Sequence, residues 1–243
     1  MRRFVPFREV CAKNYVPGVS IGGYSDSMTD NRKSGIALIA GSVGGIVTMA
    51  IHPTAGGAMT VAQVHRLAIV SGVAHGLAMV SVLLLFLGAC GLAKSIAGAD
   101  RISFAAIVTF GLACIAVFVA ATVSGFIIPA ILKHMAQDAA ADAHPWQIVV
   151  DGIFQINQAF AEIYSVAASL AVILWSVSVL RNGGLSRGLA VYGCIISALI
   201  IVGISIGHLR LNVHGMAAVW FGQAIWFVVA GWQLWSPRAI AAH

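Results

Sequence analysis

The chain alternates between long apolar runs and short polar connections. Six runs reach the about 20 residues that a helix needs to cross the hydrocarbon core of a bilayer. They lie near residues 34–52, 67–93, 102–132, 148–180, 188–208 and 214–235. A membrane β-barrel would require segments of alternating polarity, which are absent from the sequence. The pattern therefore predicts an all-α bundle of six transmembrane helices, in which every backbone group is paired within its own helix.

Composition agrees with this pattern. Of the 243 residues, 60% are hydrophobic and only 9% are charged, whereas about 25% are charged in a typical soluble domain. The net charge of +6 comes from basic residues that flank the runs. No basic stripe with interleaved aromatic residues is found, so we expect no binding of nucleic acid. We expect the chain to be embedded in a lipid bilayer. The four cysteines form no CxxC pair, which argues against a zinc ribbon or a disulfide framework.

The basic residues predict the orientation. Eleven of the 14 Lys and Arg residues fall on one side of the predicted spans: Arg2, Arg3, Arg8, Lys13, Arg32, Lys33, Lys94, Arg101, Arg181, Arg187 and Arg238. The other side holds Arg66, Lys133 and Arg210. Because cytoplasmic loops are enriched in Lys and Arg, this asymmetry predicts that both termini are cytoplasmic.

The sequence thus divides into a basic N-terminal cytoplasmic arm at 1–33, a transmembrane domain at 34–235 and a short cytoplasmic tail at 236–243. The stretch "MTDNRKSGIALIAG" at Met28 reads like the start of a protein. We therefore expect residues 1–27 to contribute little to the fold.

Several ionisable residues share one predicted depth. His52, His75 and Glu162 each lie 19 positions from a basic residue at the cytoplasmic end of their span. At 1.5 Å per residue this is roughly 28 Å, close to the thickness of the hydrocarbon core. His208 and His214 lie at a similar level, near the outer ends of the last two spans. The spacing predicts a layer of His and Glu near the outer boundary of the membrane.

The polar stretch "QINQAFAE" at 155–162 opens the fourth span. Asp151, Gln155, Gln158 and Glu162 follow an i, i+4, i+7, i+11 pattern, which places them on one face of a helix. The third and fourth predicted spans are also longer than a bilayer requires. We therefore expect a helical hairpin that protrudes outward, and we expect its segment 122–158 to contact a periplasmic partner or a second copy of the chain.

Imidazole and carboxylate groups are ligands for transition metals, and paired histidines can hold a haem. The candidate metal ligands are His52, His75, His208, His214 and Glu162, with a divalent metal or a haem as the candidate cofactor. Ordinary enrichment of polar residues at helix ends explains the same layer without any ligand. The sequence has no HExxH, CxxCH or nucleophile-elbow motif, so it predicts no reaction and identifies no catalytic residue.

His75 and Glu162 lie deeper in apolar sequence than the other candidates. Ionisable residues inside a membrane are functional candidates by default, although a His–Glu pair can also serve only to fix helix packing. Together with Asp151, Gln155 and Gln158, they are the candidates for ligand binding or proton relay.

The segments "NRKSGIALIAGSVGGIVTMAIHP" and "LWSVSVLRNGGLSRGLAVYG" resemble small bacterial inner-membrane proteins of unknown function with about six helices. The resemblance covers roughly residues 28–235 and implies a multi-pass protein of the bacterial inner (plasma) membrane. The leading hypothesis is a protein that binds a metal or small ligand in an outward-facing site. The alternatives are a proton-coupled carrier that uses Glu162 and His75, and a non-catalytic accessory subunit of a membrane complex.

Overall fold

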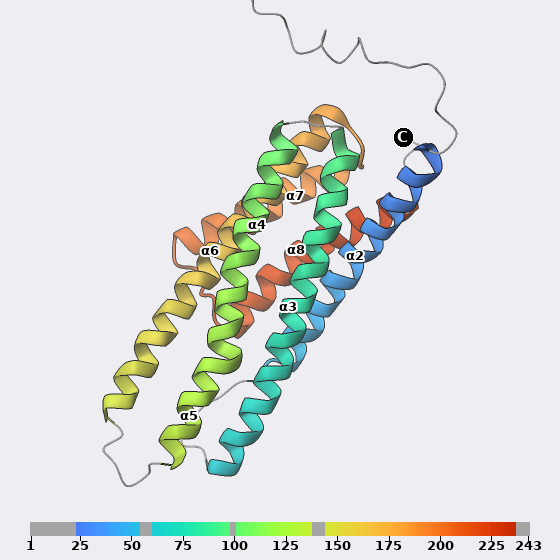
Figure 1. Ribbon diagram of the computed structural model, residues 1–243. Coiled ribbons are helices and arrows are strands. Elements are labelled where there is room, and N and C mark those ends of the chain that lie inside the picture. Colours follow the sequence, from blue (N-terminus) through green and yellow to red (C-terminus); the bar gives the residue numbers. More distant parts are fainter. Residues whose placement is uncertain (1–22, 54–59, 98–100, 138–143, 237–243) are drawn as a thin grey trace, which may run out of the picture.

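The computed structural model describes residues 23–53, 60–97, 101–137 and 144–236, and this part of the chain is a bundle of long helices (Figure 1). The elements are α2 (Gly23–Ile51), α3 (Val61–Ala97), α4 (Arg101–Thr122), the π-helical turn η1 (Val123–Ile127), α5 (Ile128–Gln137), α6 (His144–Asn182), α7 (Arg187–Ser205) and α8 (Val213–Trp235). These described residues contain no strand. Because α4, η1 and α5 follow one another without a break, six apolar helices are long enough to cross a membrane. The prediction of an all-α, six-helix membrane bundle is confirmed.

The six spans agree closely with those expected from the apolar runs. The first span is Asp30–Ile51 and the last is Val213–Trp235. Helix α2 begins earlier, at Gly23, so the last part of the predicted N-terminal arm continues this helix. Most of residues 1–27, and the tail after Ser236, lie outside the described residues, and the predictions made for them stay predictions.

The spans fall into two length classes. The first, fifth and sixth comprise 22, 19 and 23 residues, which suits a bilayer, whereas the other three comprise 36 or 37. At 1.5 Å per residue, 36 residues extend about 54 Å, well beyond a hydrocarbon core of about 30 Å. The long helices α3 and α6, and the continuous segment formed by α4, η1 and α5, therefore continue past the ends of α2 and α8, as the lower part of Figure 1 shows. The third and fourth spans are thus long, as predicted. Helix α3 packs against α5, so a third long helix lies beside this pair.

Small residues allow α2 to lie close to its two neighbours, α3 and α8. A Cβ added at Gly41 would lie 2.6 Å from the carbonyl oxygen of Ser81 on α3. At Gly45, an added Cβ would overlap the indole ring of Trp220 on α8. Small residues four positions apart favour close contact between membrane helices. Gly45 in particular creates the space that Trp220 occupies.

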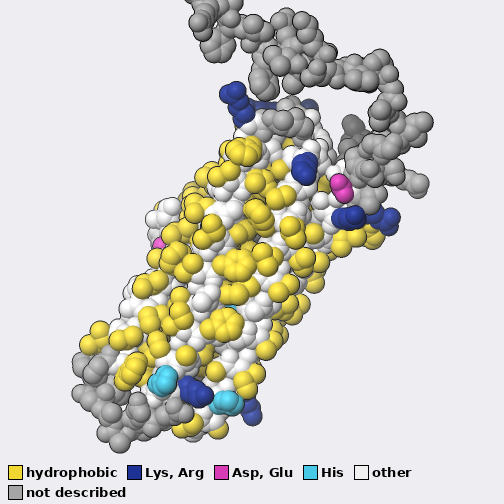
Figure 2. Space-filling view, viewed as in Figure 1, with side chains coloured by type: hydrophobic (Ala, Val, Ile, Leu, Met, Phe, Trp, Pro, Cys, Tyr) yellow, Lys and Arg dark blue, Asp and Glu magenta, His cyan; other side chains and the backbone are white. Residues whose placement is uncertain are grey.

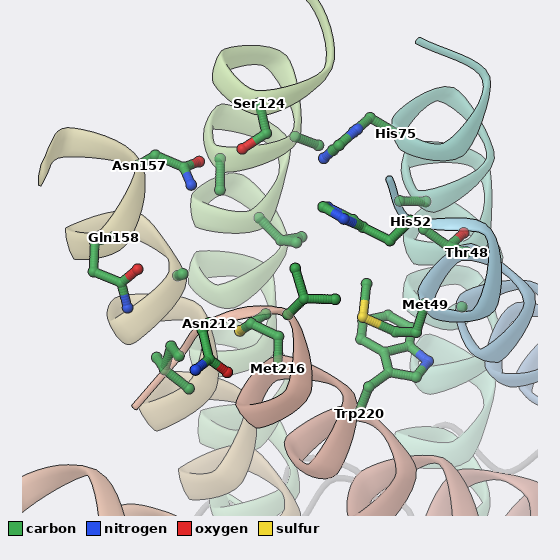
Figure 3. A pocket seen from close by; sticks show the side chains of 18 of the residues that line it. Thr48, Met49, His52, His75, Ser124, Asn157, Gln158, Asn212, Met216 and Trp220 are labelled. Atoms are coloured by element: carbon green, nitrogen blue, oxygen red, sulfur yellow. The ribbon is translucent and has the colours of Figure 1, made fainter. Parts of the chain in front are cut away.

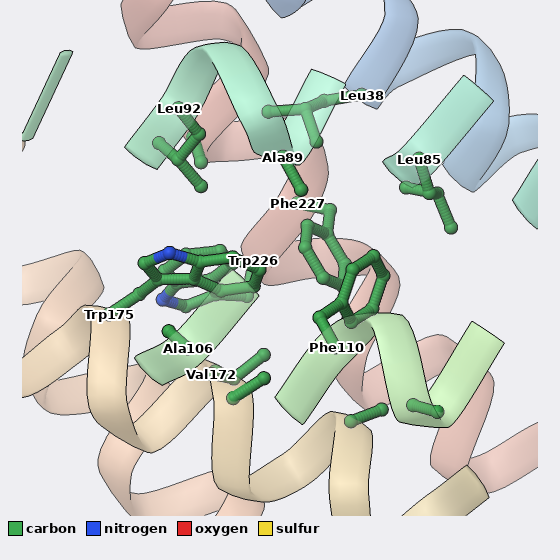
Figure 4. Close-up of a cluster of buried hydrophobic side chains, with 14 of the residues drawn as sticks. Leu38, Leu85, Ala89, Leu92, Ala106, Phe110, Val172, Trp175, Trp226 and Phe227 are labelled. Atoms are coloured by element: carbon green, nitrogen blue, oxygen red, sulfur yellow. The ribbon is translucent and has the colours of Figure 1, made fainter. Parts of the chain in front are cut away.

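An aromatic cluster fills the bundle between α4, α6 and α8 (Figure 4). The rings of Trp175 and Trp226 are stacked, with centroids 5.9 Å apart and an interplanar angle of 15°. Phe110 and Phe227 pack against them at centroid distances of 5.2 to 5.5 Å. All four side chains are 2% exposed or less. This cluster fixes the relative positions of three helices that also line the candidate site.

The surface matches a protein embedded in lipid. Hydrophobic side chains cover the face seen in Figure 2, and Lys and Arg gather towards its two ends. Large apolar side chains such as Phe104, Ile115 and Leu199 are more than 60% exposed. In a bilayer, such residues contact acyl chains and not water.

Candidate functional site

A cavity of about 380 Å³ lies between α2, α3, α4, α6 and α8 (Figure 3). Its polar lining residues are Thr48, His52, His75, Ser124, Asn157, Gln158 and Asn212, and the other lining residues are apolar, aromatic or glycine. No Asp, Glu, Lys or Arg lines it. We call this space the His52–His75 cavity. It is a partly open, mainly apolar cavity with a small number of neutral polar groups.

The cavity lies at the level where the short helices end. Thr48 belongs to the last turn of α2, and His52 follows the end of that helix. Asn212 caps the first turn of α8, and its side-chain oxygen accepts a hydrogen bond of 3.0 Å from the backbone N–H of Gly215. The long helices α3 and α6 continue past this level and provide the remaining walls. The charge distribution predicts that this is the outer end of the bundle.

His52 and His75 meet at one wall of the cavity. Their ring centroids are 5.0 Å apart, and the planes form an angle of 68°, which is an edge-to-face contact. His75 is only 7% exposed. Figure 3 shows both rings on the side of the cavity opposite Asn157 and Gln158.

Backbone carbonyls fix the tautomer of both rings. The Nδ1 atom of His75 lies 2.8 Å from the carbonyl oxygen of Ser71, and that of His52 lies 3.1 Å from the carbonyl oxygen of Pro53. A carbonyl oxygen can only accept, so each Nδ1 carries the proton and donates it. In the neutral ring, Nε2 then has a free lone pair. Each histidine thus retains one nitrogen that can accept a hydrogen bond or bind a metal.

The π-helical turn η1 holds His75 in place. The hydroxyl of Ser71 donates a hydrogen bond of 3.0 Å to the carbonyl oxygen of Ser124, which joins α3 to this turn. A Cβ added at Gly125 would lie 2.5 Å from Cβ of His75. Glycine at this position is therefore needed for the two helices to approach. Short π-helical turns often occur at functional sites.

Trp220 and two methionines form another part of the lining. Trp220 stacks on Tyr164, with ring centroids 5.8 Å apart. Met49 and Met216 line the cavity beside it, and the hydroxyl of Ser165 lies 3.8 Å from the sulfur of Met216. In Figure 3 these side chains lie on the far side of His52 from His75. The lining is therefore mainly apolar away from the histidines and the amides.

Asn157 and Gln158 line the cavity from α6. The side-chain oxygen of Asn157 is buried and has no hydrogen-bond partner among the described residues. Most buried polar groups in proteins are hydrogen-bonded. The cavity therefore presents an unpaired amide oxygen in addition to the two imidazole lone pairs.

Among the residues predicted from sequence, the structure brings three into the cavity: His52, His75 and Gln158. The side chains of the other five are exposed and do not line it: Asp151, Gln155, Glu162, His208 and His214. Their helix neighbours explain the difference, because Ala161 and Val213 line the cavity while Glu162 and His214 are one position away. Adjacent residues on a helix differ by about 100° in direction. A shared depth thus does not imply a shared direction.

Several lining residues were missed by the sequence analysis. On α6 these are Phe154, Asn157 and Ala161, which face the cavity together with the predicted Gln158 at an i, i+3, i+4, i+7 spacing. The predicted stripe that ended at Glu162 selected a neighbouring face. A polar Asn–Gln pair followed by a small residue at this spacing was the available signal. Trp220 and Met216 gave no polar signal, and Ser124 is an isolated hydroxyl in an apolar run.

The described residues contain no group of three or more His, Cys, Asp or Glu side chains that could hold a metal ion. The five predicted metal ligands are therefore not assembled into one site, because three of them are exposed. The rings of His52 and His75 touch edge to face, which leaves no gap for a porphyrin between them. The groups at the cavity that could ligate a metal are two imidazoles and two thioethers.

Comparisons of the chain with known proteins found no matching family model, no matching curated protein and no matching solved structure. The resemblance to small bacterial inner-membrane proteins therefore stays a prediction. Any proposal about function must come from the cavity itself.

Proposed function

We propose that the chain is a membrane protein that binds one small, largely apolar molecule in the His52–His75 cavity. The observation that carries this proposal is a partly open cavity of about 380 Å³ between five helices, lined by imidazole and carboxamide groups as well as apolar side chains. Protein interiors are normally packed as densely as organic crystals. Sites for small molecules measure roughly 300–1,000 Å³ and combine an apolar lining with a few polar groups. The cavity fits this description in volume and in lining.

The lining favours a neutral ligand. A charged molecule loses its hydration on entering an apolar site, and this loss is costly unless an opposite charge compensates it. No charged residue lines the cavity. The described residues place Glu162 on an exposed surface, away from the histidines. Glu162 and His75 therefore do not form the pair that a proton-coupled carrier would require, and ligand binding in the cavity needs no such pair.

The test is to identify what the protein carries when it is purified from native membranes in lipid nanodiscs. We expect native mass spectrometry to detect a small molecule bound to the wild-type protein. Ala121→Phe places a ring in the cavity, because Ala121 lines it and is buried. This variant should lack the molecule.

The matched control is Ala105→Phe, which makes the same change at an exposed position on the same helix. It should retain the bound molecule. Thermal unfolding of both variants checks that they are folded. A wild-type protein without any bound molecule, or with one that both variants retain equally, would contradict the proposal.

A soft metal ion is the second candidate ligand, and it rests on the thioethers of Met49 and Met216 in the same lining. Thioether and imidazole groups suit Cu(I), whereas hard cations prefer oxygen ligands. In this case, purified protein should compete with bathocuproine disulfonate for Cu(I), and Met49→Leu should weaken the competition. If wild type and Met49→Leu competed equally well, the thioether of Met49 would not be a ligand of the metal.

The predicted partner surface at 122–158 remains a separate proposal. Exposed apolar residues there include Phe126, Ile148 and Ile156. Some of these belong to the long hairpin that continues past the short helices, where a second copy or a periplasmic protein could reach them. Cross-linking through Ile148→Cys in intact membranes tests this contact, and a purely monomeric product would count against a homo-oligomer.

A further inference from the structure

The chemistry of the unpaired atoms restricts the kind of ligand that the cavity can hold. His52 and His75 both use Nδ1–H to donate to backbone carbonyls. The side-chain oxygen of Asn157 is buried without a partner among the described residues. These three atoms are hydrogen-bond acceptors when the imidazoles are neutral. The indole N–H of Trp220 is also buried without a partner among the described residues, but it lies against Gly45 of α2. A matching ligand must supply hydrogen-bond donors.

The usual donors in biological small molecules are ammonium groups, amides and hydroxyl groups. An ammonium ion is disfavoured, because no carboxylate lines the cavity to compensate its charge. Ketones, ethers and esters could accept from the carboxamide N–H groups of Gln158 and Asn212, but they supply no donor and would leave the imidazole nitrogens unpaired. A hydroxyl group is neutral and short, and it suits an acceptor that lies next to an apolar wall.

We propose that the ligand is an apolar alcohol or phenol whose hydroxyl donates its one hydrogen bond to Nε2 of His75 or His52. The unpaired oxygen of Asn157, across the cavity, accepts a hydrogen bond only where the ligand carries a second donor. This inference rests on the proposed small-molecule function and specifies the chemistry of its ligand.

The apolar remainder of the ligand lies against the methionine and tryptophan side of the lining. Met49, Met216 and Trp220 provide this surface, and Val117 and Ala121 of α4 continue it. Figure 3 shows Met49 and Trp220 next to one another, apart from the two amides of α6. A molecule with a hydroxyl head and a compact hydrocarbon body therefore matches both parts of the cavity.

The experiment compares two probes that differ in one donor. The first is 4-propylphenol, and the second is its methyl ether, 4-propylanisole, which has almost the same shape and no O–H group. Binding of each is measured by isothermal titration calorimetry with wild-type protein in nanodiscs, with empty nanodiscs as the reference for partition into lipid. We expect the phenol to bind at least about tenfold more tightly, because only the phenol can donate a hydrogen bond to an imidazole nitrogen.

Variants locate this preference. His75→Phe and His52→Phe each keep an aromatic ring and remove one lone pair. The preference for the phenol should fall to about twofold or less in at least one of them, which identifies the acceptor. His75→Gln retains an acceptor oxygen and should restore part of the preference, which separates hydrogen bonding from packing. His214→Phe is the matched control, since this histidine lies at the same level but is exposed. It should behave like the wild-type protein.

Each outcome decides the inference. Equal binding of both probes to wild-type protein would overturn the hydroxyl inference but would support a small-molecule cavity. Binding of neither probe would overturn the inference as well, and native mass spectrometry would still test the proposed function independently. The comparison of the two probes on wild-type protein needs no variant. It therefore decides the inference even if His75→Phe fails to fold.

Discussion

Two regions of the same bundle contrast sharply: the aromatic cluster and the His52–His75 cavity. Helices α4, α6 and α8 contribute to both. In the cluster, α4 places Phe110 and α8 places Trp226, and both are buried by close packing. At the cavity, the same two helices place Ala121 and Met216. The chain fills space with large rings in one region and leaves space beside small residues in the other.

This contrast indicates that the cavity is a consequence of the sequence and not of loose packing in general. The small lining residues Gly45, Ala78, Ala120, Ala121 and Ala161 come from four different helices. Larger apolar side chains at these positions would close the space. Imidazole and carboxamide groups line the cavity, whereas the only polar atoms of the four cluster rings are the indole N–H groups of Trp175 and Trp226. The predictions below test the two regions against each other.

The largest effect is expected in the aromatic cluster. Trp226→Ala removes a fully buried ring that stacks on Trp175, and it should lower the free energy of unfolding by about 3–5 kcal/mol. The measurement is denaturant-induced unfolding in mixed micelles, followed by circular dichroism. Trp232→Ala is the control, because Trp232 is 53% exposed. Similar losses in both variants would contradict the assignment of Trp226 to a tightly packed core.

A second prediction compares two alanines on α4. Ala113 is fully buried in the packed cluster, whereas Ala121 lines the cavity. Ala113→Leu should destabilise the protein by about 1–3 kcal/mol, because a filled interior resists added methylenes. Ala121→Leu should change the stability by less than about 1 kcal/mol, since the cavity has room for the added groups. If Ala121→Leu proved as destabilising as Ala113→Leu in the same unfolding assay, the cavity would not be open space.

A third prediction concerns the contact between η1 and α3. Gly125→Ala would place a Cβ 2.5 Å from that of His75, so we expect a loss of about 1–3 kcal/mol through overpacking. It should also displace the His75 ring and weaken binding of 4-propylphenol. Gly76→Ala is the matched control on α3, because nothing lies within 4 Å of its added Cβ. Thermal unfolding of Gly125→Ala at or above the wild-type temperature would contradict the close contact.

The smallest effect is expected for Ser71→Ala, which removes the hydrogen bond from Ser71 to the carbonyl of Ser124. Interhelical hydrogen bonds in membrane proteins average about 0.6 kcal/mol, so the stability should fall by about that amount. Thr109→Ala removes a hydrogen bond within a single helix at an exposed site and provides the comparison. A double-mutant cycle with Gly125→Ala would show whether the two contacts act together. Independent, additive effects would separate the hydrogen bond from the position of η1.

The fold was largely predictable from the sequence, because hydrophobic runs and flanking charges report directly on membrane spans. The predicted limits of the fifth span, 188–208, differ from the observed span Arg187–Ser205 by only a few residues. The membership of α3 in the long hairpin was not predicted. Helix α3 begins at Val61, but polar residues near its start, such as His65 and Arg66, delay the apolar run until residue 67. The predicted span was therefore shorter than the helix.

The site was predictable only in part. Counting residues from flanking charges gives a depth along the membrane normal, and this brought His52 and His75 to attention before their contact was known. It gives no rotation about the helix axis, so exposed residues such as Glu162 and His214 entered the same set. The rotation of a membrane helix depends on packing against its neighbours. Apolar lining residues such as Trp220 are defined by that packing, which a single sequence does not encode in its polar pattern.

The most direct test of the central claim is the binding of 4-propylphenol to wild-type protein, Ala121→Phe and Ala105→Phe in nanodiscs. If the His52–His75 cavity is the ligand site, wild type and Ala105→Phe bind the phenol equally. Ala121→Phe, which fills the cavity, then loses at least about tenfold in affinity, because the ring occupies the space of the ligand. Equal affinity in all three proteins would show that the phenol binds elsewhere and would contradict the account.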